Sequence, residues 1–76
     1  MILARFKDGH RELGSIWLHL IHGVMIEKNT IDVILDGHIQ QFIYTTDKNA
    51  EMDYSRITAQ IDSIYQFSKT RSTTTH

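Results

Sequence analysis

The tripeptide Asp-Gly-His occurs twice in this chain, as residues 8–10 and 36–38, and apolar and β-branched residues flank both copies. An Asp-Gly pair in this setting is a strong signal for a tight hairpin turn. A type I′ turn needs positive φ at both central residues, and Asp followed by Gly tolerates that conformation. The sequence therefore predicts two β-hairpins, each closed by a type I′ turn.

The alternation of apolar side chains gives each hairpin a register. In the first hairpin, residues 1–7 pair with residues 10–16, and in the second, residues 30–35 pair with residues 38–44. The pairs expected to lie opposite each other are Arg5 and Glu12, Ala4 and Leu13, Ile31 and Phe42, and Ile34 and Ile39.

The segment between the hairpins, residues 15–26, is rich in β-branched and aromatic residues. It predicts a long continuation of the second strand, with a bulge at Gly14 and a turn at Lys28 and Asn29. A short helix beginning at Ser15 is the alternative, because apolar residues also recur here at helical spacing. Periodicity in so short an apolar run leaves both interpretations open.

After Thr46 the apolar residues recur every three or four positions, as expected for an amphipathic helix. Acidic residues cluster at its start and basic residues at its end, which suits the helix dipole. The stripe comprises Tyr54, Ile57, Ile61, Ile64 and Phe67, the acidic residues are Asp47, Glu51 and Asp53, and the basic ones are Lys69 and Arg71. The predicted fold is α+β: a four-stranded antiparallel β-meander (ββββα) with one C-terminal amphipathic helix packed on one face. Residues 1–69 form the single domain, and residues 70–76 form a flexible C-terminal tail.

Both faces of the predicted sheet carry large apolar side chains, whereas a single helix covers only one face. Ile31 and Val33 point to one side of the sheet, and Ile34 and Ile39 to the other. Soluble monomers rarely leave an apolar patch of a few hundred Å² bare. We therefore expect a homodimer or another protein partner; the alternative is a sheet that curls and buries part of both faces.

Composition excludes several classes of function. The chain has 76 residues, no cysteine and a net charge of −1, so disulfides and thiolate metal sites are absent and no global field attracts nucleic acid. The longest apolar run, residues 16–26, is too short to span a bilayer. We expect a protein without a targeting segment or membrane span, located in the cytoplasm of a bacterial or virus-infected host cell.

The five histidines do not form a convincing metal site. In a four-stranded meander both Asp-Gly turns lie at one end of the sheet, but a strand separates His10 from His38 by about 9–10 Å, which is too far for two ligands of one zinc ion. We expect no metal and no cofactor. The same end would form an exposed polar rim, suited to protein recognition, although solvated hairpin tips look alike; its residues are Asp8, His10, Arg11, Asp36 and His38.

The chain contains none of the common catalytic motifs, such as a nucleophile elbow, a zinc-protease helix or a phosphate-binding loop. We therefore expect a small non-catalytic protein-interaction module that binds a partner protein through its sheet face and helix, with Trp17 and Ile34 on the uncovered face as further contact residues. Cysteine-free domains of this size and build are often regulators or inhibitors encoded by phages and other mobile elements, which is an association at the level of the class.

Nucleic-acid binding is the alternative function. Arg5, Lys7 and Arg11 surround Phe6 on the first hairpin, and a basic hairpin with an aromatic residue suits a phosphate backbone. Asp8 and Glu12 lie beside these cations and dilute their charge. Because such affinity depends on uncompensated cations, the alternative ranks below protein binding.

Overall fold

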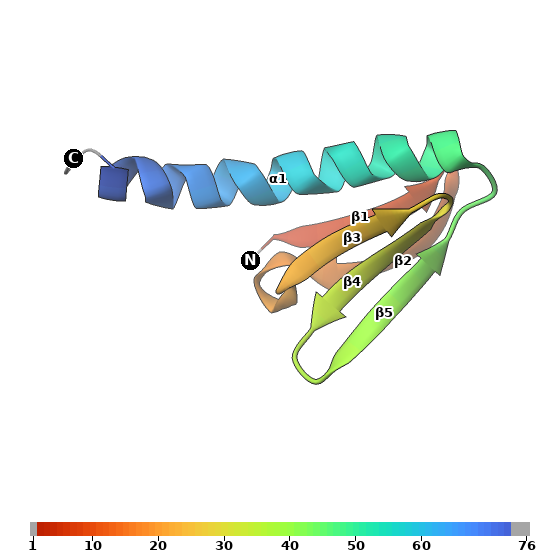
Figure 1. The fold of residues 1–76 in the computed structure, drawn as a ribbon, viewed down its shortest axis with the longest axis horizontal. Helices are drawn as coiled ribbons and strands as arrows, with labels where there is room; N and C mark the ends of the chain where they lie inside the picture. Colours follow the sequence, from red (N-terminus) through yellow and green to blue (C-terminus); the bar gives the residue numbers. More distant parts are fainter. Residues whose placement is uncertain (1, 74–76) are drawn as a thin grey trace.

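The computed structural model is an α+β fold, and it describes the backbone of residues 2–73 and the side chains of residues 2–64 (Figure 1). Strands β1 and β2 form one antiparallel sheet, and β3, β4 and β5 form a second. The elements are β1 (Leu3–Asp8), β2 (Arg11–Trp17), the 3-10 helix η1 (Leu18–Leu20), β3 (Gly23–Glu27), β4 (Thr30–Leu35), β5 (His38–Ile43) and α1 (Asp47–Thr73). The α+β class is confirmed, whereas the single four-stranded meander is only roughly matched, because five strands form two sheets.

The extra strand arises because the segment between the hairpins is interrupted. Residues 15–26 form neither one long strand nor a helix beginning at Ser15; η1 turns the chain after Trp17, and β3 begins at Gly23. Leu18 and Ile21 are buried on either side of this corner, and the Ile21 amide donates to the Leu18 carbonyl at 3.1 Å. Burial of these two apolar side chains stabilises the corner and directs the chain into a second sheet.

The register predicted for the first hairpin is wrong. Lys7 lies opposite Glu12 and Arg5 opposite Ser15, because Gly9 and His10, rather than Asp8 and Gly9, occupy the turn. Within the hairpin itself the pairing shifts by one residue at Leu13, which has no residue opposite it in β1. The predicted bulge is therefore present one residue before Gly14.

The register predicted for the second hairpin is confirmed, with Ile31 opposite Phe42 and Ile34 opposite Ile39. Its turn is made by residues 36 and 37. Among the described residues of the two turns, only Gly9 (φ 64°) and Gly37 (φ 83°) have positive φ. A type I′ turn needs two such residues, so the predicted turn type is wrong for both hairpins.

The two sheets pack face to face. The Phe6 ring of β1 stacks on the Phe42 ring of β5 with centroids 4.4 Å apart. Gly14 of β2 lies directly under the same ring, since a Cβ atom placed there would be 2.9 Å from Phe42 Cε1. The inner faces of the two sheets therefore bury each other, and the core comprises Ala4, Phe6, Leu18, Ile21, Ile31, Val33, Phe42, Tyr44, Ala50 and Ile57.

Helix α1 lies across β1 and β3 and so bridges the two sheets (Figure 1). Thr46 caps its start by accepting a hydrogen bond from the Asn49 amide at 3.0 Å. Ala50 and Ile57 are buried on the face toward the strands, whereas Ile64 is exposed. The helix bounds extend to Thr73, into the segment 70–76 expected to be a tail; the rest of that segment lies outside the described residues, as do the side chains of Phe67, Lys69 and Arg71.

Candidate protein-binding surface

The outer face of the three-stranded sheet carries exposed apolar side chains. Along each strand side chains alternate between faces, so Val33 and Phe42 point into the core and their neighbours point outward. Met25, Ile39 and Ile43 have 50%, 58% and 62% of their surface exposed. Ile34, placed on this face by the sequence, lies half-buried opposite Ile39 and Gly23. We call this surface the outer face; its residues are Met25, Glu27, Asp32, Ile34, Ile39, Gln41 and Ile43.

One end of the outer face is hollowed and acidic. The hollow has a volume of about 260 Å³ and is lined by Glu27, Lys28, Asn29, Thr30, Asp32 and Gln41. The side-chain amide of Gln41 donates from Nε2 to Asp32 Oδ1 at 3.0 Å, which orients the carboxylate. Two carboxylates beside one lysine give the hollow a net negative charge, which suits a basic side chain from outside.

Trp17 and Ile34 do not share a surface. Trp17 is exposed on the outward side of the β1–β2 sheet, opposite Leu3. Because the inner faces of the two sheets pack against each other through Phe6 and Phe42, their outer faces point in different directions. The contact residues expected on one sheet face therefore lie on two.

The two Asp-Gly-His turns lie at opposite ends of the fold (Figure 1). Between the two turns the chain crosses the fold three times, along β2, β3 and β4. An odd number of crossings brings it to the opposite end. His10 and Arg11 are exposed near the start of α1, whereas Asp36 and His38 are exposed at the other end. The predicted polar rim does not form as one surface, and any binding role of these residues stays a prediction.

Asp8 is buried, not part of an exposed rim. Only 7% of its surface is exposed, and its carboxylate accepts hydrogen bonds from the Thr45 amide, the Thr45 hydroxyl and Asn49 Nδ2 at 3.1, 3.0 and 2.8 Å. The Asn49 hydrogen bond, with those from Thr45, outweighs burial and holds the pKa of Asp8 below its ordinary value. Asp8 thus ties the first turn to the start of α1.

A second buried network joins α1 to the edge of β1. Asp53, 5% exposed, accepts hydrogen bonds from the Lys7 amide at 3.1 Å, from Arg56 Nη2 at 2.6 Å and from the Tyr44 hydroxyl. Arg56 also donates to the Arg5 carbonyl. Burial, followed by the hydrogen bond to Asp53, raises the pKa of Tyr44. These bonds satisfy the Lys7 amide and the Arg5 carbonyl on the edge of β1.

Sequence reasoning missed both networks, although each left a signal. Asp8 has the same strand parity as the buried Ala4 and Phe6, so alternation predicts that it points inward. Asp53 lies four residues before Ile57, on the buried side of α1. Carboxylates at inward positions indicate internal hydrogen-bond networks, because buried charges need partners.

The three cations expected to form a basic patch are divided. Arg5 and Lys7 are exposed and share the outward side of β1, where Glu12 lies opposite Lys7. Arg11 lies opposite Asp8 and contributes to the lowered pKa of that carboxyl. Of the three cations, Arg5 is the one that has no carboxylate opposite it in the pairing of β1 with β2.

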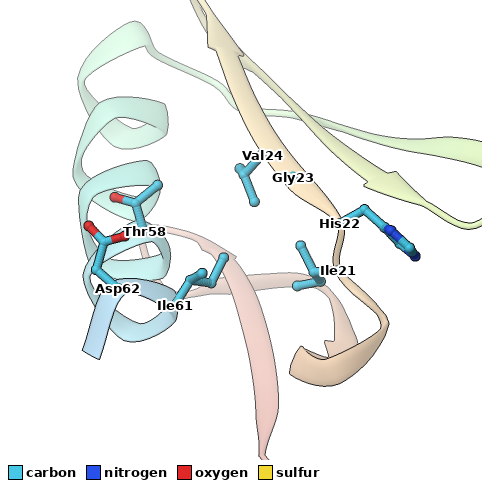
Figure 2. Close-up of a pocket in the computed structure, with 7 residues that line it drawn as sticks. All are labelled: Ile21, His22, Gly23, Val24, Thr58, Ile61 and Asp62. Carbon is cyan, nitrogen blue, oxygen red and sulfur yellow. The ribbon is translucent and has the colours of Figure 1, made fainter. Parts of the chain in front are cut away.

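A small cleft lies between β3 and α1. Figure 2 shows Ile21 and Val24 facing Thr58 and Ile61 across it, while the His22 ring points away. Its volume of about 110 Å³ is well below the roughly 300–1,000 Å³ of small-molecule sites. Among the described side chains, no three His, Asp or Glu residues converge as metal ligands would. Across the described residues, no helix has both the length and the apolar character needed to span a bilayer.

Comparisons of the chain with protein-family models, with curated proteins and with solved structures gave no match.

Proposed function

We propose that this domain is a small non-catalytic protein-interaction module, a regulator or inhibitor that binds a partner protein through the outer face in the cytoplasm. The exposure of Met25, Ile39 and Ile43 on one side of a sheet carries this proposal. Their side chains form an apolar surface whose burial would be favourable at about 25 cal/mol per Å². Several exposed apolar side chains on one sheet face of a small domain are typical of an interaction site.

The chemistry of the outer face defines the partner. Met25 and Ile43 lie opposite Asp32 and Thr30, two residues that line the hollow with its carboxylates. A matching surface therefore carries apolar residues beside a lysine or arginine. Apolar contacts would supply most of the affinity, and the charges would speed encounter and select the partner. The proposed ligand is therefore a folded protein with a basic, partly apolar patch.

Capture from the native host, followed by mass spectrometry and binding measurements with the purified partner, tests this proposal. The Met25→Glu variant places a charge in the outer face, and we expect binding to weaken by at least about tenfold, which corresponds to roughly 1.4 kcal/mol. The matched control is Met52→Glu, which changes another exposed methionine, on α1. Equal binding by the Met25→Glu variant and the wild type would contradict the proposal.

Nucleic-acid binding through the first hairpin remains the competing hypothesis. Labelled DNA and RNA are expected to show no salt-dependent mobility shift with the wild-type protein, because Glu12 and Asp8 face two of the three cations. A salt-dependent shift that disappears when Arg5, Lys7 and Arg11 are all changed to alanine would favour that hypothesis over protein binding.

A further inference from the structure

Strand β5 has a free edge. It pairs with β4 on one side, and Tyr44 just after it donates its amide to the Asn29 carbonyl at 2.7 Å. Because backbone groups alternate in direction along a strand, those of Gln40 and Phe42 also face β4. The backbone N–H and C=O groups of Ile39, Gln41 and Ile43 face away, and no described residue hydrogen-bonds to them.

Nothing in β5 discourages the addition of another strand. Edge strands usually carry charged side chains, proline, a bulge or a cover. The segment HIQQFI has no Asp, Glu, Lys, Arg or Pro, and its pairing with β4 runs without a register shift. By contrast, the outward edge of β1 is covered by Asp53 and Arg56.

The sequence of β5 is complementary to itself in one antiparallel register. If Gln41 lies opposite Gln41 of a second copy, then Ile39 lies opposite Ile43 of that copy, and Ile43 opposite its Ile39. In Ile39, Gln41 and Ile43 the backbone N–H and C=O groups point away from β4, so each opposite pair exchanges hydrogen bonds. The exposed isoleucine side chains then become cross-strand apolar neighbours on the outer face.

We propose that two copies of this chain dimerise by antiparallel pairing of β5 with β5 about a twofold axis at Gln41. The result is a continuous six-stranded sheet with an isologous interface. The inference goes beyond the proposed function and does not rest on it, because it concerns the backbone edge of β5, whereas Met25, the residue changed in the binding test, lies on β3 with β4 between them.

Single cysteines test the register in a chain that has none of its own. In a hydrogen-bonded antiparallel pair the Cα atoms are about 5.5 Å apart, within the reach of a disulfide. Under mild oxidation Gln41→Cys should form a covalent dimer at least about tenfold faster than Gln40→Cys, because the proposed pairing gives it a high effective concentration. Gln40 is also exposed but would face Phe42 of the second copy. Equal rates for the two variants would overturn the register.

Charge exchange between copies tests the same pairing without a covalent bond. The double variants Ile39→Lys with Ile43→Lys, and Ile39→Glu with Ile43→Glu, should each sediment as monomers, because like charges face each other. An equimolar mixture should form a heterodimer, since each lysine then faces a glutamate. Wild-type protein with the mass of a monomer at every concentration, or a mixture that stays monomeric, would overturn the proposal, whatever the result of the Met25→Glu binding test.

Discussion

The first Asp-Gly-His hairpin holds its aspartate inside the fold, whereas the second holds its aspartate in solvent. In the first, Asp8 is the last residue of β1 and Gly9 takes the first turn position; in the second, Asp36 and Gly37 together make the turn. A shift of one residue therefore separates a buried carboxylate from an exposed one. The parity of a residue in its strand decides its environment more than the tripeptide around it.

The edges of the two hairpins differ in the same way. The outward edge of β1 is covered, because Asp53 and Arg56 of α1 bond to the Lys7 amide and the Arg5 carbonyl. The edge of β5 carries no such cover among the described residues. The first hairpin thus packs with the helix, whereas the second has an uncovered edge and an exposed apolar face, as the proposed dimer requires.

The largest expected effect lies where the two hairpins meet, at Phe42. The Phe42→Ala variant removes the ring that stacks on Phe6 and should lower the free energy of unfolding by about 3–5 kcal/mol. Ile39→Ala, on the same strand but exposed, should change it by less than about 0.5 kcal/mol. Urea unfolding at a concentration where the protein is monomeric measures both values. Similar losses in the two variants would contradict the inward and outward faces assigned to β5.

Gly14→Ala tests the close approach of the hairpins. The added Cβ would lie 2.9 Å from the Phe42 ring, so we expect a loss of about 1–3 kcal/mol from overpacking. Without that contact, replacing a strand glycine by alanine should stabilise the protein by about 0.5–1 kcal/mol. The sign of the change in thermal unfolding therefore decides whether the two sheets pack as described.

Asp8→Asn and Asp36→Asn compare the two aspartates directly. Asp8→Asn should lower the melting temperature at pH 7, because an amide cannot accept all three hydrogen bonds from Thr45 and Asn49. Asp36→Asn should leave it nearly unchanged, since Asp36 is exposed in its turn.

The stability difference between the wild type and Asp8→Asn should depend on pH. The pKa of Asp8 is lower in the folded protein than its ordinary value of 3.8. Its contribution to stability is therefore complete above about pH 3.8 and is lost as the pH falls through the lower folded pKa. Between pH 5 and pH 2 the stability gap between wild type and Asp8→Asn should narrow. A gap that stays constant over this range would show that ionised Asp8 is not the source of the difference.

Local signals in the sequence predict the second hairpin and the helix. The alternation from Ile31 to Phe42 requires Val33 and Phe42 to share a side, and the two-residue Asp-Gly turn selects one of the registers that meet this condition; the structure has that register. The helix follows from apolar residues at intervals of three and four, of which Ile57 is fully buried. An exposed apolar sheet face follows from the same alternation at Ile39 and Ile43.

Features that depend on tertiary contacts escape such reasoning. No glycine or proline marks the corner at Leu18–Leu20, which is stabilised by burial of Leu18 and Ile21 against other elements. Missing this corner removed one strand from the predicted sheet and placed both turns at one end. Asp8 bonds to residues more than thirty positions away, and its inward parity is the sole local sign of those bonds.

Amide hydrogen exchange followed by NMR, measured over a wide range of protein concentration, tests the difference between the two edges most directly. The Lys7 amide, bonded to Asp53, should exchange slowly at every concentration. The backbone amide of Gln41 should exchange rapidly in dilute solution and become protected as the concentration rises, because β5 then pairs with a second copy. A Gln41 amide that exchanges as slowly as that of Lys7 in dilute solution, or that stays unprotected at the highest concentration, would contradict this account.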